Sequence, residues 1–147
     1  MRLDRLCLRD FRNYEQQELT LQDGVNLLIG PNAQGKTNVL EAVFLLTGSR
    51  SWRAGRKSEM IRFGAQSAFI EAGLHARNRD FEIRMTLPLS GRGTTTVNGV
   101  KATRQSRLSD VFRCVLFAPE DLSLLRDGAA ARRRFLDTAL CQLRPRY

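Results

Sequence analysis

The chain has 147 residues, of which 42% are hydrophobic and 27% are charged, and this is the composition of an ordinary soluble globular protein with a sizeable core. No apolar run approaches the length of a membrane span and no signal peptide is recognisable, so we expect a cytoplasmic protein without a membrane partner. The formal net charge of +9 favours a polyanionic partner.

The first thirty residues predict three short strands. Residues 2–11 are apolar at several positions and form the first candidate, and residues 18–21 form the second. Asp23-Gly24 is a turn signal, and the apolar run over residues 25–29 is typical of a buried strand.

A phosphate-binding motif follows directly. Gly30 to Thr37 spell GPNAQGKT, which matches the G-x-x-x-x-G-K-[ST] loop of P-loop NTPases. The residues after it have helical spacing of apolar side chains, and this helix is expected to end near Gly48. Strand, glycine loop and helix are the context that the motif needs.

Each part of this loop has a chemical role. Gly30 and Gly35 allow backbone conformations that let N–H groups converge on phosphates at the helix N-terminus. Lys36 is expected to reach the β- and γ-phosphates, and the Thr37 hydroxyl to ligate Mg²⁺. Lys36 and Thr37 are therefore the catalytic candidates. The full set of candidate cofactor-binding residues in the loop is Gly30, Pro31, Asn32, Ala33, Gln34, Gly35, Lys36 and Thr37.

A basic segment over residues 49–57 lacks apolar periodicity. Its charges are Arg50, Arg53, Arg56 and Lys57. They are either a solvated loop or contacts to DNA or nucleotide phosphates. Trp52 between them either stacks on a base or packs its ring under the loop.

Residues 66–103 predict an antiparallel meander. Apolar and polar residues alternate over residues 68–76 and 81–87, and Asn98-Gly99 is a strong signal for a two-residue hairpin. We therefore expect an α/β fold with an antiparallel β subdomain, unlike simple small NTPases.

The last third predicts a buried strand over residues 114–117 and, after Gly128, a helix to about Leu143. The inner side of this helix is expected to carry Phe135, Leu136, Ala139, Leu140 and Leu143. No apolar strand ends in the acidic residue that P-loop hydrolases use to hold Mg²⁺. Either the chain hydrolyses nothing or it is a fragment of a longer protein, and we favour the fragment.

Several separate segments resemble one family. They are Leu8-Arg-Asp-Phe-Arg-Asn-Tyr14, Gly30 through Ala42, Ser51-Trp-Arg53, Phe117-Ala-Pro-Glu-Asp-Leu122 and Arg132-Arg-Arg-Phe-Leu-Asp137. With these motifs the chain resembles the N-terminal part of the RecF family of bacterial recombination mediators, which are ABC-type ATPases related to SMC proteins.

The resemblance implies an ABC-ATPase lobe I, with residues 1–147 as the N-terminal part of a head whose remainder is missing. It implies ATP and Mg²⁺ as cofactors, a homodimer that forms with ATP, and binding to single-stranded and duplex DNA and gap junctions. It also implies partners of the RecR/RecO type and roles in recombinational repair, replication restart and the SOS response. A weak DNA-stimulated ATPase is expected of the complete protein, not of this piece alone.

The resemblance adds residues to the candidate site. Asn38 continues the loop toward the α-phosphate, Arg12 matches an N-terminal arginine near the nucleotide, and Arg53 lies in a loop similar to the arginine-bearing loop of SMC heads. Residues 119–121 occupy the place of the Q-loop, but no glutamine stands there. Two other hypotheses stay open: a P-loop phosphotransferase of another family, and a nucleic-acid module that ignores ATP.

Overall fold

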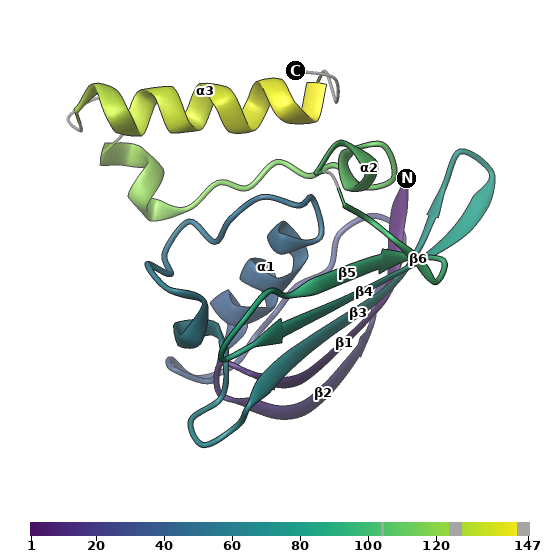
Figure 1. The fold of residues 1–147 in the computed structure, drawn as a ribbon, viewed down its shortest axis with the longest axis horizontal. Coiled ribbons are helices and arrows are strands. Elements are labelled where there is room, and N and C mark those ends of the chain that lie inside the picture. Colours follow the sequence, from purple (N-terminus) through teal and green to yellow (C-terminus); the bar gives the residue numbers. More distant parts are fainter. Residues whose placement is uncertain (104, 124–127, 144–147) are drawn as a thin grey trace.

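The computed structural model describes residues 1–103, 105–123 and 128–143, and it contains one sheet with helices on one side (Figure 1). The strands are β1 (Arg2–Phe11), β2 (Tyr14–Thr20), β3 (Ser67–Ala76), β4 (Arg79–Pro88), β5 (Thr94–Val97) and β6 (Val100–Lys101). The helices are α1 (Lys36–Leu45), α2 (Gln105–Ser109) and α3 (Ala129–Leu143), with the 3₁₀ turns η1 (Lys57–Met60) and η2 (Pro119–Ser123).

The sheet has six strands in the order β2-β1-β3-β4-β5-β6, and every neighbouring pair is antiparallel. Four of the five pairings are hairpins between consecutive strands. The exception joins β1 to β3, where Leu6 lies opposite Ala72. The expected meander is therefore present, and the first two strands extend it.

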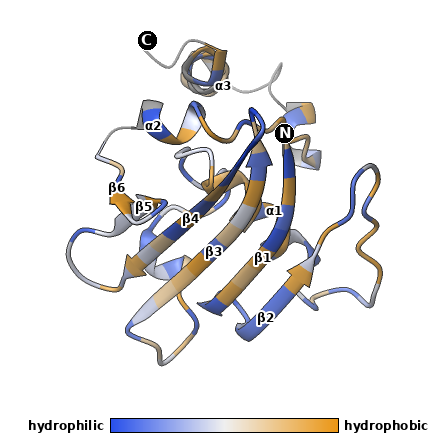
Figure 2. Cartoon of the chain, turned by 90° about the vertical axis from the view of Figure 1, so that its right-hand side faces the viewer, coloured by the Kyte–Doolittle hydropathy of each residue, from blue (hydrophilic) through white to orange (hydrophobic). Residues whose placement is uncertain are grey.

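The core lies between the sheet and α1. Side chains of β3 alternate between half-buried and buried along the whole strand. Figure 2 shows hydrophilic and hydrophobic residues following one another along the same strand. The buried side chains of the sheet pack with Val39, Ala42 and Leu45 of α1. Because the period of a strand is two residues, the opposite face carries polar side chains.

The β5–β6 hairpin has the turn that its sequence predicts. Asn98 and Gly99 both adopt positive φ, at 49° and 75°, which is the geometry of a type I′ turn. The Asn98 side chain also accepts a hydrogen bond from the backbone N–H of Glu82 at 2.7 Å. This contact holds the turn against β4.

Two expected buried strands are wrong. Residues 25–29 and 114–117 have no regular secondary structure and pair with no strand among the described residues, and Val25 and Val115 are 95% and 99% exposed. An apolar run is typical of a central strand in a parallel sheet, and such a strand is buried only between neighbours. Every described strand belongs to the antiparallel sheet, so these runs have no neighbours.

The expectation for α3 is right in position and only partly right in burial. The helix spans the expected residues, and Ala139 and Leu140 are half-buried, but Phe135, Leu136 and Leu143 are exposed instead of facing inward. Figure 1 shows α3 at the margin of the molecule, beside α2, with no described helix or strand on its far side. No helix of the described residues is both long and apolar enough to cross a bilayer.

Candidate nucleotide-binding site

The GPNAQGKT loop leads into α1 as the motif requires. Gly35 is the N-cap of α1 with φ of 99°, a left-handed conformation that favours glycine, and Ala33 before it also has positive φ. Among the described residues, no oxygen accepts a hydrogen bond from the backbone N–H of Gly35, Lys36 or Thr37. These donors at the positive end of the helix suit an anion.

Lys36 supplies the charge of the loop. Its Nζ donates hydrogen bonds to the carbonyl oxygens of Gly30 and Pro31, both at 2.6 Å. No carboxylate within the described part of the chain forms an ion pair with it. The ammonium is therefore held inside the loop without a counter-ion, and a phosphate would provide one.

Thr37 stands in the first turn of α1 with an exposed side chain. Its hydroxyl is the only candidate that the sequence offers as a Mg²⁺ ligand. Among the residues that the structure describes, no cluster of three or more acidic, histidine or cysteine side chains could hold a metal by itself. Bound Mg²⁺ would need phosphate oxygens in addition to Thr37.

The β1–β2 turn lies beside this loop and contacts it. The sequence alone did not indicate this contact. Asn38 Nδ2 donates a hydrogen bond to Asn13 Oδ1 at 2.7 Å, and the Tyr14 ring lies against Gly35. Burial raises the pKa of the Tyr14 phenol, which keeps the ring neutral. The turn therefore fixes the first residues of α1 from the side.

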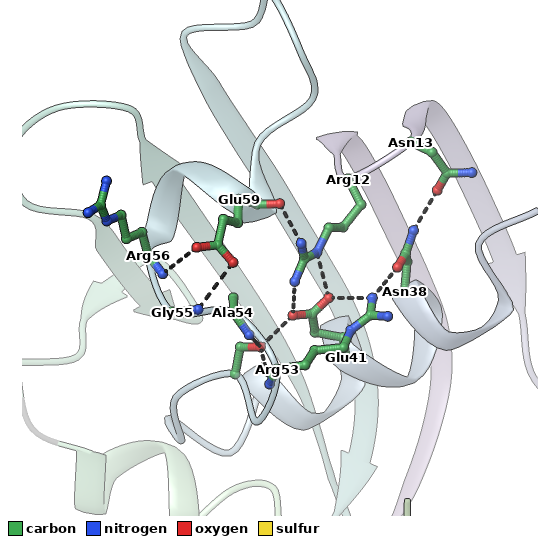
Figure 3. A network of polar contacts seen from close by, with 10 residues as sticks. Arg12, Asn13, Asn38, Glu41, Arg53, Ala54, Gly55, Arg56 and Glu59 are labelled. Atoms are coloured by element: carbon green, nitrogen blue, oxygen red, sulfur yellow. Dashed lines mark hydrogen bonds and ion pairs between the residues drawn. The ribbon is translucent and has the colours of Figure 1, made fainter. Parts of the chain in front are cut away.

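Arg12 and Arg53 meet on one carboxylate, Glu41 (Figure 3). Arg12 Nε and Nη2 donate to the two Glu41 oxygens at 2.8 and 2.6 Å, and Arg53 Nη2 donates to Glu41 Oε2 at 2.9 Å. The structure thus brings together two predicted residues through a third that was not predicted. Nothing local in the sequence connects this glutamate to Arg12 or Arg53.

The surroundings of Glu41 keep it charged. Its burial by itself would raise the pKa of this carboxyl, but hydrogen bonds from Arg12, Ser51 and Arg53 outweigh burial and lower the pKa below its ordinary value of 4.5. The site at neutral pH therefore contains one carboxylate between two guanidinium groups.

The remaining basic residues of the loop stay apart from this cluster. Arg50, Arg56 and Lys57 are exposed, and none forms an ion pair with any described carboxylate. Trp52 packs edge-on against Phe44 of α1, with ring centroids 5.7 Å apart. In the structure the Trp52 ring therefore packs under the loop, which is the second of the two interpretations given for it.

The segment in the place of a Q-loop forms η2. Asp121 Oδ2 accepts a hydrogen bond from the backbone N–H of Ala118 at 2.7 Å and so stabilises its own turn. The side chain of Glu120 lies outside the described residues.

Curated relatives match along nearly the whole chain. A DNA replication and repair protein RecF from Halalkalibacterium halodurans is 40% identical over 148 residues, and one from Agathobacter rectalis is 38% identical over 136 residues. The chain spans 39% and 38% of the lengths of these two relatives.

Solved structures agree in fold. The recombination mediator protein RecF with ATP superposes with a TM-score of 0.89 at 32% identity, covering 96% of this chain and 39% of that one. The SMC head domain from Thermotoga maritima has a TM-score of 0.61 at 26% identity, covering 75% of this chain and 41% of that one. The fold is that of P-loop, ABC-type ATPase heads with an antiparallel β subdomain. The family model for the RecF/RecN/SMC N-terminal domain matches residues 2–124, and the chain belongs to this family.

Proposed function

We propose that this chain is the ATP-binding lobe of a DNA replication and repair ATPase of the RecF type. The observation that carries the proposal is Lys36, an ammonium group with no acidic partner in the part of the chain that the structure describes, beside backbone donors at the start of α1 that find no acceptor there. The names of the curated relatives and the similarity to a RecF structure with ATP support the same function.

In this proposal the loop from Gly30 to Thr37, together with Asn38, binds the phosphates of ATP. Lys36 leaves its two carbonyl partners for the β- and γ-phosphates, while Thr37 and phosphate oxygens ligate Mg²⁺. Arg12 lies at the flank of the same helix, so it is proposed as a nucleotide-site residue rather than as a free surface charge.

The broader role is proposed from the family. ATP binding would join two heads on DNA, with Arg50, Arg53, Arg56 and Lys57 facing phosphates, and RecR- and RecO-type proteins as partners in repair and in the SOS response. Residues 1–147 would form the first part of that head. Sequencing the gene beyond the codon for Tyr147 tests this assignment, because a downstream signature motif and a strand ending in Asp are expected.

Nucleotide titration with a fluorescent ATP analogue tests the site in the full-length protein. Lys36→Ala should abolish saturable binding, because it removes the charge that the loop orients. Lys101→Ala is the matched control, since it removes an exposed lysine of β6, outside the phosphate loop and the basic segment, and should leave binding unchanged. Tight binding by the Lys36 variant would overturn the proposal.

A further inference from the structure

Glu41 is a completely buried carboxylate, 0% exposed, at the centre of the network in Figure 3. It comes from the middle of α1, and its partners are 29 and 12 residues away in the chain, at Arg12 and Arg53. Carboxylates are almost never fully buried unless they are paired. The two arginines therefore account for the position of Glu41.

The basic loop depends on this carboxylate for its conformation. Ser51 Oγ donates a hydrogen bond to Glu41 Oε1 and accepts hydrogen bonds from the backbone N–H groups of Arg53 and Ala54, at 3.2 and 2.9 Å. One hydroxyl thus joins the buried charge to the turn that carries Arg53.

The η1 turn directly after the basic loop is held by Arg12. Its Nη1 donates to the carbonyl of Glu59 at 2.6 Å, and its backbone N–H donates to the carbonyl of Met60 at 2.9 Å. Because the same guanidinium also pairs with Glu41, this one carboxylate links α1 to the basic loop and, through Arg12, to the turn that follows the loop.

The network also reaches the phosphate loop. Arg53 Nη2 donates to Asn38 Oδ1 as well as to Glu41, and the backbone N–H of Asn38 donates to the carbonyl of Gly35 at 2.7 Å. Asn38 directly follows Thr37. A movement of Arg53 therefore has a direct physical connection to the first turn of α1.

The cluster around Glu41 carries a net positive charge. Two guanidinium groups face one carboxylate, and neither arginine forms an ion pair with any other carboxylate of the described residues. The Arg53 side chain is 30% exposed and that of Arg12 is 18% exposed. Arg53 is thus the more accessible of two cations that share one counter-ion.

We propose that Glu41 is a positioning residue that fixes the basic loop of residues 49–57 to the nucleotide helix, so that nucleotide binding at the phosphate loop changes the ordering of the basic loop. The proposal rests on the proposed function, since it takes the ligand of the phosphate loop to be a nucleotide. Glu41 itself touches no ligand; it acts through Arg12, Ser51 and Arg53.

Hydrogen–deuterium exchange of the full-length protein tests this, with and without ATP and Mg²⁺. In Glu41→Gln without nucleotide, the amides of Arg53 and Ala54 should exchange about fivefold faster, as expected for the loss of a hydrogen bond. In the same variant the effect of nucleotide on exchange over residues 49–61 should disappear.

Glu71→Gln is the matched control. Glu71 also holds two arginines, Arg5 and Arg84, but on the opposite face of the sheet, and its loss should leave exchange of the basic loop unchanged. Unchanged loop exchange in Glu41→Gln, or an equal change in Glu71→Gln, would overturn the proposal.

A second variant covers the case in which Glu41→Gln does not fold. Arg53→Gln removes the link from the loop to Glu41 and leaves the pair of Arg12 with Glu41, so the effect of nucleotide on the loop should be lost while the fold persists. An unaltered nucleotide effect in this variant contradicts the proposal. If wild-type protein binds no nucleotide, the proposed function fails, while faster exchange in the nucleotide-free variant still supports the positioning role.

Discussion

The Tyr14 ring and Gly35 are in such close contact that a Cβ atom on Gly35 would lie 2.9 Å from Tyr14 Cζ and 2.6 Å from Asn13 Oδ1. These distances are shorter than any ordinary contact of a methyl group, and Gly35 also has φ of 99°. The β1–β2 turn and the phosphate loop are therefore complementary surfaces that only glycine allows to meet.

Gly35→Ala should therefore be costly for two reasons. The strained φ and the clash together should lower the free energy of unfolding by about 3 kcal/mol and weaken nucleotide binding at least tenfold. Thermal unfolding and nucleotide titration measure the two effects. Gly24→Ala is the control for strain alone, because Gly24 has φ of 86° and nothing within 4 Å of its Cβ position. An equal, small effect of both substitutions would show that the contact with Tyr14 is unimportant.

Trp52 is the only tryptophan of the chain, so its fluorescence reports on the basic loop. Since its ring packs on Phe44, the emission maximum should lie at shorter wavelength than that of free tryptophan, and added DNA should not quench it through base stacking. Phe44→Leu should shift the emission toward longer wavelength. Strong quenching by single-stranded DNA would instead favour the base-stacking interpretation.

The exposed charges of the basic loop should appear in the salt dependence of DNA binding. Replacing both Arg56 and Lys57 with alanine should reduce the slope of log K against log salt by about 2, because each phosphate contact contributes about 0.9. The matched control replaces Arg77 in the turn after β3 and Arg79 at the start of β4, at the opposite end of the sheet, and removes the same charge. Equal slopes for the two double variants would place the DNA elsewhere.

The pKa of Glu41 predicts a dependence of stability on pH. This pKa is lower in the folded state than 4.5, so Glu41 stabilises the fold at pH values above 4.5, and this stabilisation is lost as pH falls through the folded-state pKa. The charged groups facing Glu41 are the guanidinium groups of Arg12 and Arg53.

Comparison of wild type with Glu41→Gln isolates this contribution. At about pH 7 the variant should be less stable by about 3 kcal/mol, near the low end for a broken buried pair because both arginines keep access to water. The difference should shrink as the pH falls below 4.5, since wild-type Glu41 then becomes protonated too. Chemical denaturation at several pH values measures it, and a difference independent of pH would exclude the charge as its cause.

The parts of the fold that depend on residues close together in the sequence were predictable from the sequence. The helix after the glycine loop, the alternation along β3 and the Asn98-Gly99 turn all follow from spacing and local turn chemistry. The burial of an apolar segment was not predictable in the same way, as residues 25–29 and 114–117 show. Val25 and Val115 look like core residues in sequence, yet burial of a strand depends on neighbours that other parts of a chain must supply.

The candidate site divides in the same way. The phosphate loop is a contiguous motif, so its residues could be named, although their binding of nucleotide stays a prediction. Glu41 could not be assigned, because a glutamate in a helix is ordinarily solvated and nothing local connects it to Arg12 or Arg53. Only the fold shows that these three residues share one place.

The sheet has a single pairing between strands that are not consecutive in the chain, that of β1 with β3, and this bears on the order of folding. Hairpins between consecutive strands form quickly because little chain entropy is lost, and only β1 with β3 must close a loop of more than sixty residues, as in the pair of Leu6 with Ala72. The segment enclosed by that loop contains the glycine motif and α1. We therefore expect the hairpin ladder to assemble first and the phosphate loop to acquire its final shape late, when β1 docks and brings Arg12 onto α1.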